Sequence, residues 1–301
     1  MQNKLQSNQF ENLELLAKQV VEGFILGLHK SPFHGFSVEF AEHRLYNSGD
    51  NLKHIDWKVF GRTDKLFIKK YEEETNLRCQ LLIDCSSSML HPKDAPVNKL
   101  QFSALAAASI ITILKKQVDA VGLTTFDDEI HFHANAKSGT VHNKRLMATL
   151  ENLLNYQIMD KKSNTVQIMH QIAENIHKRS MVIVFSDMFD SYANQHELFD
   201  ALQHLKYNKH EVLLFHVQDK NQEVDFNFEN RPLEFIDMET GEKIKLNSNQ
   251  IKNSYQQRMK DYRNEIQLKC AQFGIDIIDA NMNEGYEPIL RSYLIKRNKM
   301  N

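Results

Sequence analysis

The 301-residue chain contains few cysteines and no long apolar stretch. Its three cysteines are odd in number and form no CxxC pair, so neither a disulfide framework nor a structural zinc site is expected. We predict that Cys79, Cys85 and Cys270 are reduced and mostly buried. No run approaches the roughly 18 apolar residues of a membrane span, and the start lacks the basic and apolar segments of a secretory signal. We therefore expect a cytoplasmic protein without membrane insertion.

An excess of charge of one sign is also lacking. Lys and Arg total 37 against 39 Asp and Glu, which gives a formal net charge of −2. A chain balanced in this way has no general attraction for nucleic acid or for an anionic membrane, so a partner must be recognised locally. The sequence has no GxxxxGK[ST] or GxGxxG loop either, and so gives no support for ATP hydrolysis by this chain or for dinucleotide binding.

From residue 77 onward, short apolar runs alternate with longer segments of helical period. This pattern is typical of a doubly wound, mostly parallel sheet with helices on both faces, which is an α/β fold. A hairpin is expected where Asp127 and Asp128 separate two of the runs. The predicted strands are 77–84, 120–126, 129–133, 181–186, 212–217 and 275–278, and the predicted helices are about 99–117, 142–155, 166–177, a segment ending near 207, 250–273 and 288–296.

The first 75 residues have a different pattern. A helix over about 10–28 leads into an alternating, glycine-punctuated stretch that predicts small antiparallel strands and turns. We therefore divide the chain into an N-terminal helix with a small β region, residues 1–75, and a main α/β domain, residues 76–301. Within the main domain a β-hairpin excursion is expected at about 224–247.

Polar side chains follow the predicted strands at the points where those strands end. Asp84 ends the first strand and opens the pattern DxSxS, which continues with Ser86 and Ser88. Asp187 follows the apolar run MVIVFS, and Thr165 opens a helix between these two places. Because ligands of parallel sheets gather at the carboxyl ends of the strands, we expect these side chains to converge. Two serines two residues apart can turn both hydroxyls toward one point beside the aspartate.

Such a set of oxygen atoms suits Mg²⁺, or Mn²⁺ in its place, because these ions take oxygen ligands in near-octahedral geometry and Mg²⁺ keeps several waters. Three hydroxyls and two carboxylates donate little negative charge, so the bound ion would attract one more acidic oxygen from outside. The prediction is therefore a metal site that docks a protein partner. Its expected ligands are Asp84, Ser86, Ser88, Thr165 and Asp187.

The same residues resemble the metal-ion-dependent adhesion site of von Willebrand factor A domains: DxSxS, a later threonine, and an aspartate after a hydrophobic strand. The resemblance implies the Rossmann-like sheet of that fold. It also implies that the serines and the threonine coordinate the ion directly or nearly so, while the two aspartates act largely through waters. One departure is that Thr165 follows Asn164, where the family often has glycine.

The N-terminal stretch is similar to the signature of bacterial proteins grouped as domain-of-unknown-function family 58. The matching motifs are Phe36–Phe40, Arg44–Tyr46, Gly49–Asp50, His54–Lys58 and Arg62. Members of that family are commonly associated with MoxR-type AAA+ ATPases. The resemblance therefore implies a non-enzymatic adaptor or co-chaperone-like role beside such a motor, with the ATPase or its substrate as the partner.

Two alternatives stay open. An aspartate at the tip of a first strand with Mg²⁺ nearby also describes haloacid dehalogenase-type phosphatases, but these use a second acid where this chain has Ser86. The other alternative is a scaffold with a vestigial metal site. Two further groups are interpreted without a metal: Asp127 to Glu129 as turn formers, and His131 with His133 as surface or packing residues, because no third zinc ligand accompanies them.

Overall fold

The computed structural model describes residues 13–30, 43–45, 57–63, 65–69, 77–93, 95–156, 165–188, 195–237 and 241–300. Two compact units are present, Met1–Phe24 with Leu77–Asn301, and Ile25–Asn76. In the smaller unit, β1 (His43–Leu45) pairs antiparallel with β2 (Phe67–Lys69), and α2 (Trp57–Thr63) lies between them in sequence. The motifs Phe36–Phe40 and Gly49–Asp50 lie outside the described residues, as do His54 to Asp56.

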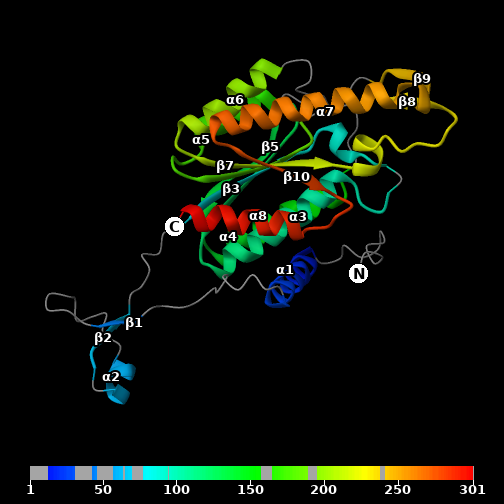
Figure 1. Ribbon diagram of the computed structural model, residues 1–301. Helices are drawn as coiled ribbons and strands as arrows, with labels where there is room; N and C mark the ends of the chain where they lie inside the picture. Colours follow the sequence, from blue (N-terminus) through cyan, green and yellow to red (C-terminus); the bar gives the residue numbers. More distant parts are fainter. Residues whose placement is uncertain are drawn as a thin grey trace. The chain divides into compact units, whose positions relative to one another are not determined.

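The larger unit is built on a six-stranded sheet with the order β10-β7-β6-β3-β4-β5 (Figure 1). Every neighbouring pair is parallel except β4 with β5. Numbered along the chain within this sheet, the order is 3-2-1-4-5-6, which is that of doubly wound folds. The strands are β3 (Arg78–Asp84), β4 (Ala120–Phe126), β5 (Ile130–Lys137), β6 (Met181–Ser186), β7 (Glu211–Gln218) and β10 (Asp276–Asn281). The predicted doubly wound, mostly parallel α/β sheet is confirmed.

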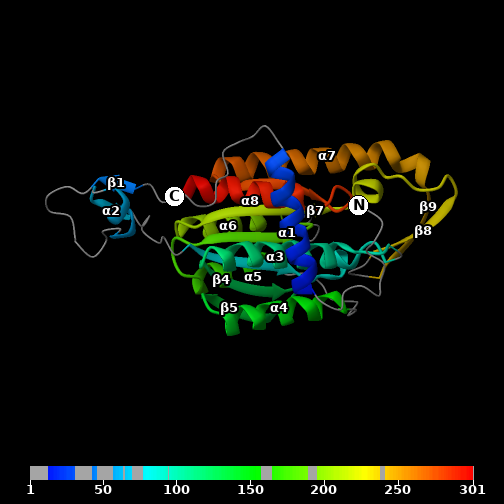
Figure 2. The ribbon, with the colours of Figure 1, turned by 90° about the horizontal axis from the view of Figure 1, so that it is seen from below.

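Helices cover both faces of this sheet, as predicted (Figure 1). One face carries α3 (Lys99–Lys116), α4 (Thr140–Leu154) and α8 (Glu287–Met300), and the other carries α5 (Thr165–Asn175), α6 (Gln195–Tyr207) and α7 (Ser248–Phe273). The part of α1 (Leu13–Lys30) that belongs to the larger unit lies against the first layer, where Glu14 pairs with Lys115 of α3 at 3.2 Å (Figure 2). Among the described residues no helix is both long and apolar enough to span a bilayer.

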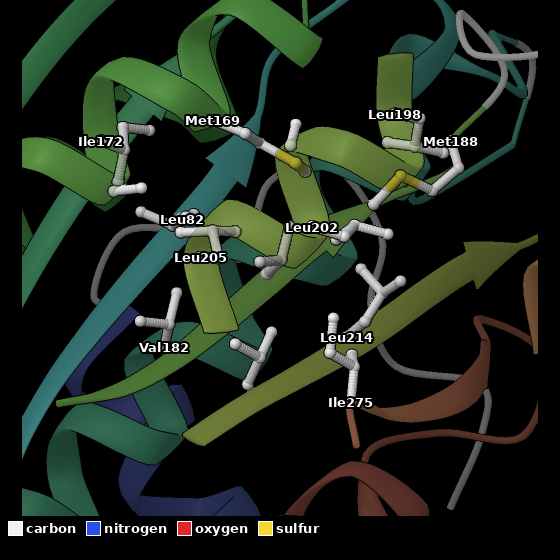
Figure 3. Close-up of a cluster of buried hydrophobic side chains, with 14 of the residues drawn as sticks. Leu82, Met169, Ile172, Val182, Met188, Leu198, Leu202, Leu205, Leu214 and Ile275 are labelled. Atoms are coloured by element: carbon white, nitrogen blue, oxygen red, sulfur yellow. The ribbon is translucent and has the colours of Figure 1, made fainter. Parts of the chain in front are cut away.

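The hydrophobic core explains why the central strands are unbroken apolar runs in the sequence. In β6 every residue is buried, because helices cover a parallel strand on both sides. Leucine, isoleucine, valine and methionine side chains from β3, β6, β7, α5 and α6 fill the space between the sheet and its second helical layer (Figure 3). On the opposite face α3 is buried around most of its circumference, and small alanines let it lie close to the strands. Cys79, Cys85 and Cys270 are buried and unpaired, as predicted.

Two antiparallel hairpins complete the larger unit. β4 and β5 form the hairpin expected around Asp127 and Asp128, with register shifts between Val121 and Leu123 and between Thr125 and Phe126. A separate two-stranded sheet pairs β8 (Pro232–Ile236) with β9 (Lys243–Asn247) between β7 and α7. Two short helical turns follow strands of the main sheet: η2 (Ser87–Leu90) after β3, and η4 (Lys220–Val224) after β7.

Candidate metal centre

The strand order brings the two predicted aspartates to one edge of the sheet. β3 and β6 are adjacent and parallel, with Ile83 opposite Phe185, so Asp84 and Asp187 follow neighbouring strands at their carboxyl ends. From β3 the chain continues to β4 on one side, and from β6 it continues to β7 on the other. The two aspartates therefore lie at the topological switch point, where open α/β sheets bind their ligands.

The side-chain oxygen atoms of the DxSxS segment lie close to one another. Asp84 Oδ1 accepts a hydrogen bond from the Ser86 backbone N–H over 2.9 Å, and the hydroxyl oxygens of Ser86 and Ser88 are 3.1 Å apart. Adjacent ligands of an octahedral Mg²⁺ ion at its usual bond length are about 2.9 Å apart. The spacing of the two hydroxyls thus fits neighbouring coordination positions. The Cys85 N–H donates to the carbonyl oxygen of Phe126 over 2.6 Å and fixes this segment to the end of β4.

A third serine, which the sequence motif did not include, holds the other oxygen of Asp84. Ser186 Oγ donates to Asp84 Oδ2 over 2.6 Å and accepts from the Met188 N–H over 3.0 Å. Ser186 is the last residue of β6 and is fully buried. A polar residue at the end of the apolar run MVIVFS was a usable signal, because such a hydroxyl must find partners inside the protein.

The electrostatic setting favours a cation. Burial raises the pKa of Asp84 well above its ordinary value, the nearby charge of Asp187 raises it further, and hydrogen bonds from Ser186 and Ser86 only partly oppose this. Two buried carboxylates of like charge are unfavourable unless positive charge lies nearby. Together with the hydroxyl pair, they form a donor set whose chemistry fits a hard divalent ion.

Asp187 already contacts one cation, which sequence reasoning missed. The fully buried Lys99 donates from Nζ to Asp187 Oδ2 over 2.7 Å and to Glu223 Oε1 over 2.5 Å. Burial alone would lower the pKa of Lys99, but the two carboxylates outweigh it and raise that pKa above its ordinary value. The capping box of Asn98 and Gln101 marks the start of α3 in the sequence, yet nothing there indicates that the first lysine of the helix is buried.

The backbone around Asp187 is tied to two other elements. His216 of β7 donates from Nε2 to the carbonyl oxygen of Asp187 over 3.0 Å. The hydroxyl of Tyr262 in α7 donates to the carbonyl oxygen of Met188 over 2.5 Å. The position of the Asp187 side chain is therefore set by contacts on both sides of its own strand end.

The fifth predicted ligand is less fully defined. Thr165 is the first residue of α5, but its side chain and the segment 157–164 before it lie outside the described part of the chain. The structure brings Asp84, Ser86 and Ser88 together with Asp187, and the role of Thr165 as a ligand stays a prediction.

The other candidate groups have local partners. Asp127 Oδ1 accepts from the Glu129 N–H over 3.2 Å, which is the turn-forming role predicted for these acids. His131 Nε2 lies 2.6 Å from Asp127 Oδ2, and His133 Nδ1 lies 2.9 Å from the hydroxyl of Thr124. Within the described ranges no group of three or more His, Cys, Asp or Glu side chains is arranged to hold a metal. The switch-point site differs from such a group because two of its four predicted ligand residues that the structure describes are serines.

Comparison with known proteins shows distant relatives. Uncharacterized protein Rv1480 of Mycobacterium tuberculosis and uncharacterized protein Mb1516 of Mycobacterium bovis are each 28% identical over 138 residues, which is 46% of this chain and 43% of each relative. The match thus spans less than half the length of these curated relatives. Two solved structures are similar over 74% of this chain. The conserved hypothetical protein BatB from Bacteroides thetaiotaomicron is 13% identical, is covered over 98% of its own chain and gives a TM-score of 0.43. An aerotolerance-related membrane protein from Bacteroides fragilis is 14% identical, is covered over 99% of its own chain and gives a TM-score of 0.44.

The N-terminal motifs and the α/β domain together indicated one particular family. The model of the family described as "Protein of unknown function DUF58" matches residues 42–265, which is most of the chain, so this protein belongs to that family.

Proposed function

We propose that this chain is a non-enzymatic protein-interaction module that binds Mg²⁺, or Mn²⁺, and presents the ion to an acidic group of a protein partner. The proposed ligands are Asp84, Ser86, Ser88, Thr165 and Asp187, with Thr165 included on the sequence resemblance. The observation that carries the proposal is the close pair of serine hydroxyls beside two buried carboxylates at the switch point. The resemblance to proteins that accompany MoxR-type AAA+ ATPases makes such an ATPase, or its substrate, the proposed partner in the cytoplasm.

Each residue has a distinct role in this proposal. The neutral hydroxyls of Ser86 and Ser88 offer lone pairs without adding negative charge. Asp84 supplies charge, and its orientation is fixed by the hydrogen bonds from the Ser86 N–H and the Ser186 hydroxyl. When bound, the ion supplies a coordination position for one oxygen atom of the partner.

Thermal unfolding with and without the ion tests the metal site. We expect millimolar Mg²⁺ to raise the melting temperature relative to EDTA, by about 4–5 °C when the ion is at one hundred times its dissociation constant. The isosteric Asp84→Asn variant should lose this shift. A matched control is Asp128→Asn, which changes an exposed carboxylate in the β4–β5 turn and should keep the shift. Equal melting curves for the unchanged protein in both conditions would favour the scaffold alternative.

A pull-down from a cell extract tests the partner. With Mg²⁺ present, the unchanged chain should recover a AAA+ ATPase, and Asp84→Asn should not. Recovery that does not depend on Asp84 or on the ion would place the contact elsewhere on the chain and contradict the docking role of the metal.

The hydrolase alternative makes a different prediction. A phosphatase that uses Asp84 as its nucleophile needs an acid to protonate the leaving group, and the residue two positions on is Ser86, whose hydroxyl does not release a proton near neutral pH. We therefore expect no turnover by the Mg²⁺-loaded protein of an alkyl phosphate ester, whose alkoxide leaving group needs that proton. Turnover that disappears in Asp84→Asn would replace the interaction module with an enzyme.

A further inference from the structure

Lys99 is an unusual component of a cation site because it brings a positive charge of its own. It is the first residue of α3, and its side chain is fully buried. A lysine rarely occupies such a position unless carboxylates compensate its charge. Here the ammonium lies 2.7 Å from Asp187 and 2.5 Å from Glu223. One of these two carboxylates belongs to the proposed ion site and the other does not.

Glu223 is fixed in its position by the backbone. Its Oε2 atom accepts from the Asp219 N–H over 2.8 Å, while Oε1 faces Lys99. The residue lies in the π-helical turn η4 directly after β7. One oxygen atom of the Glu223 carboxylate is held by the main chain and the other by the ammonium. The negative charge of Glu223 therefore offsets part of the positive charge that Lys99 places beside Asp187.

The sum of charges shows what this arrangement does to an ion. With an ion bound and their carboxyl groups ionised, Asp84, Asp187 and Glu223 would contribute three negative charges, and Lys99 contributes one positive charge. Because the ammonium contacts Asp187 directly, it weakens the field that this carboxylate exerts on a neighbouring divalent ion. A site with less negative charge binds the ion less tightly but leaves more of the ion's positive charge for an outside carboxylate.

We propose that Lys99 lowers the cation affinity of this site by neutralising part of the negative charge of Asp187. Glu223 opposes this effect, because it neutralises part of the positive charge of the ammonium. The inference rests on the proposed function, because it assumes that a divalent ion binds beside Asp84 and Asp187. Lys99 acts through Asp187 and is a positioning residue, not a ligand.

A purely structural ion pair would behave differently. Removing Glu223 or Lys99 would then change the stability of the fold without altering the affinity for an ion. The present inference requires changes of affinity in opposite directions, since one substitution exposes Asp187 to more of the ammonium charge and the other removes that charge.

The experiment measures Mn²⁺ binding to the full chain by titration with electron paramagnetic resonance detection of the free ion. In Glu223→Gln the ammonium loses a counter-charge, so we expect the dissociation constant to rise about tenfold. In the double variant Lys99→Met with Glu223→Gln both charges are gone, and we expect the constant to fall about tenfold below that of the unchanged protein. Glu223→Gln keeps the lysine, so an unchanged dissociation constant in this variant overturns the proposal even where the double variant fails to fold.

Lys296→Met is the matched control. Lys296 is also buried and also pairs with two carboxylates, Glu211 at 2.8 Å and Asp276 at 2.9 Å. These acids lie at the starts of β7 and β10, at the opposite end of the parallel strands from Asp187. The variant should be less stable and should bind Mn²⁺ as the unchanged protein does.

Three results would overturn the proposed role of Lys99, and only one of them would also overturn the proposed metal site. Equal dissociation constants in the unchanged protein and in Glu223→Gln overturn the role of Lys99 and leave the ion site intact. Tighter binding in Glu223→Gln, or weaker binding in the double variant, does the same. Absence of Mn²⁺ binding in the unchanged protein overturns the proposed function together with this inference.

Discussion

The hydroxyl of Ser186 gives the sharpest test of how the site is held together. It is fully buried, donates to Asp84 Oδ2 and accepts from the Met188 N–H, so one oxygen atom serves a charged acceptor and a backbone donor. The Ser186→Ala variant removes this atom. A buried carboxylate and a buried N–H then each lose a hydrogen-bond partner.

The expected cost follows from these two losses. A hydrogen bond to a charged group contributes roughly 1.5–3 kcal/mol, and an unsatisfied buried donor costs roughly 1–3 kcal/mol. Asp84 keeps the hydrogen bond from the Ser86 N–H, which lessens the first loss. We therefore expect Ser186→Ala to lower the free energy of unfolding by about 2–4 kcal/mol.

The control is the same substitution at an equally buried serine. Ser103 in α3 is also fully buried, but its hydroxyl donates to the carbonyl oxygen of Lys99 one turn earlier, over 2.8 Å, and the helix already engages that carbonyl. Alanine has a better helix propensity, so Ser103→Ala should cost less than about 1 kcal/mol. Urea denaturation in EDTA at pH 8.5, above the raised pKa of Asp84, measures both variants. Equal costs, or a cost below about 1 kcal/mol for Ser186→Ala, would refute the reasoning.

Three further predictions concern the rest of the fold. A Cβ atom at Gly122 would lie 2.6 Å from the carbonyl oxygen of Ala134, so Gly122→Ala should destabilise the protein by about 1–3 kcal/mol, while Gly23→Ala, which meets open space in α1, should not; equal melting temperatures would contradict this. Burial would raise the pKa of Glu211, but hydrogen bonds from Lys296 and a second lysine outweigh it and lower that pKa. The resulting stability is present at neutral pH and is lost as the pH falls through the lowered pKa, so in urea denaturation Glu211→Gln should cost more stability at pH 7 than at pH 3. An equal cost at both pH values would count against the ion pairs. Burial raises the pKa of the thiols of Cys79, Cys85 and Cys270, so a disulfide reagent such as dithiobis(nitrobenzoate) should label none of them in the native protein and all three after unfolding. Rapid labelling of the native protein would place at least one of these cysteines at the surface.

Most of the architecture could be predicted because the physical signals are local. Parallel strands covered on both faces appear as short runs of apolar residues, and β3 and β6 are buried along almost their whole length. The edge strand β5 was harder to delimit. It extends to Lys137, beyond the predicted end at His133, because it alternates polar with partly buried residues and has no apolar run at its end.

The geometry of the candidate site was predictable only in part, for a related reason. Asp84, Ser86 and Ser88 form a compact motif, and Asp187 stands at the end of an obvious strand. The contacts of Lys99 with Asp187 and Glu223 join residues that are 88 and 124 positions apart. A lysine at the start of a helix normally extends into solvent, so neither its burial nor its partners leave a pattern in the sequence.

The hydrogen bonds from His216 and Tyr262 have a consequence for the binding of the proposed ion. They fix the carbonyl groups of Asp187 and Met188 when the chain folds. The conformational entropy that the backbone of Asp187 and Met188 loses is therefore lost when the chain folds, and binding of the proposed ion would not add to that loss. Binding of the proposed ion would then require no rearrangement of the backbone at Asp187.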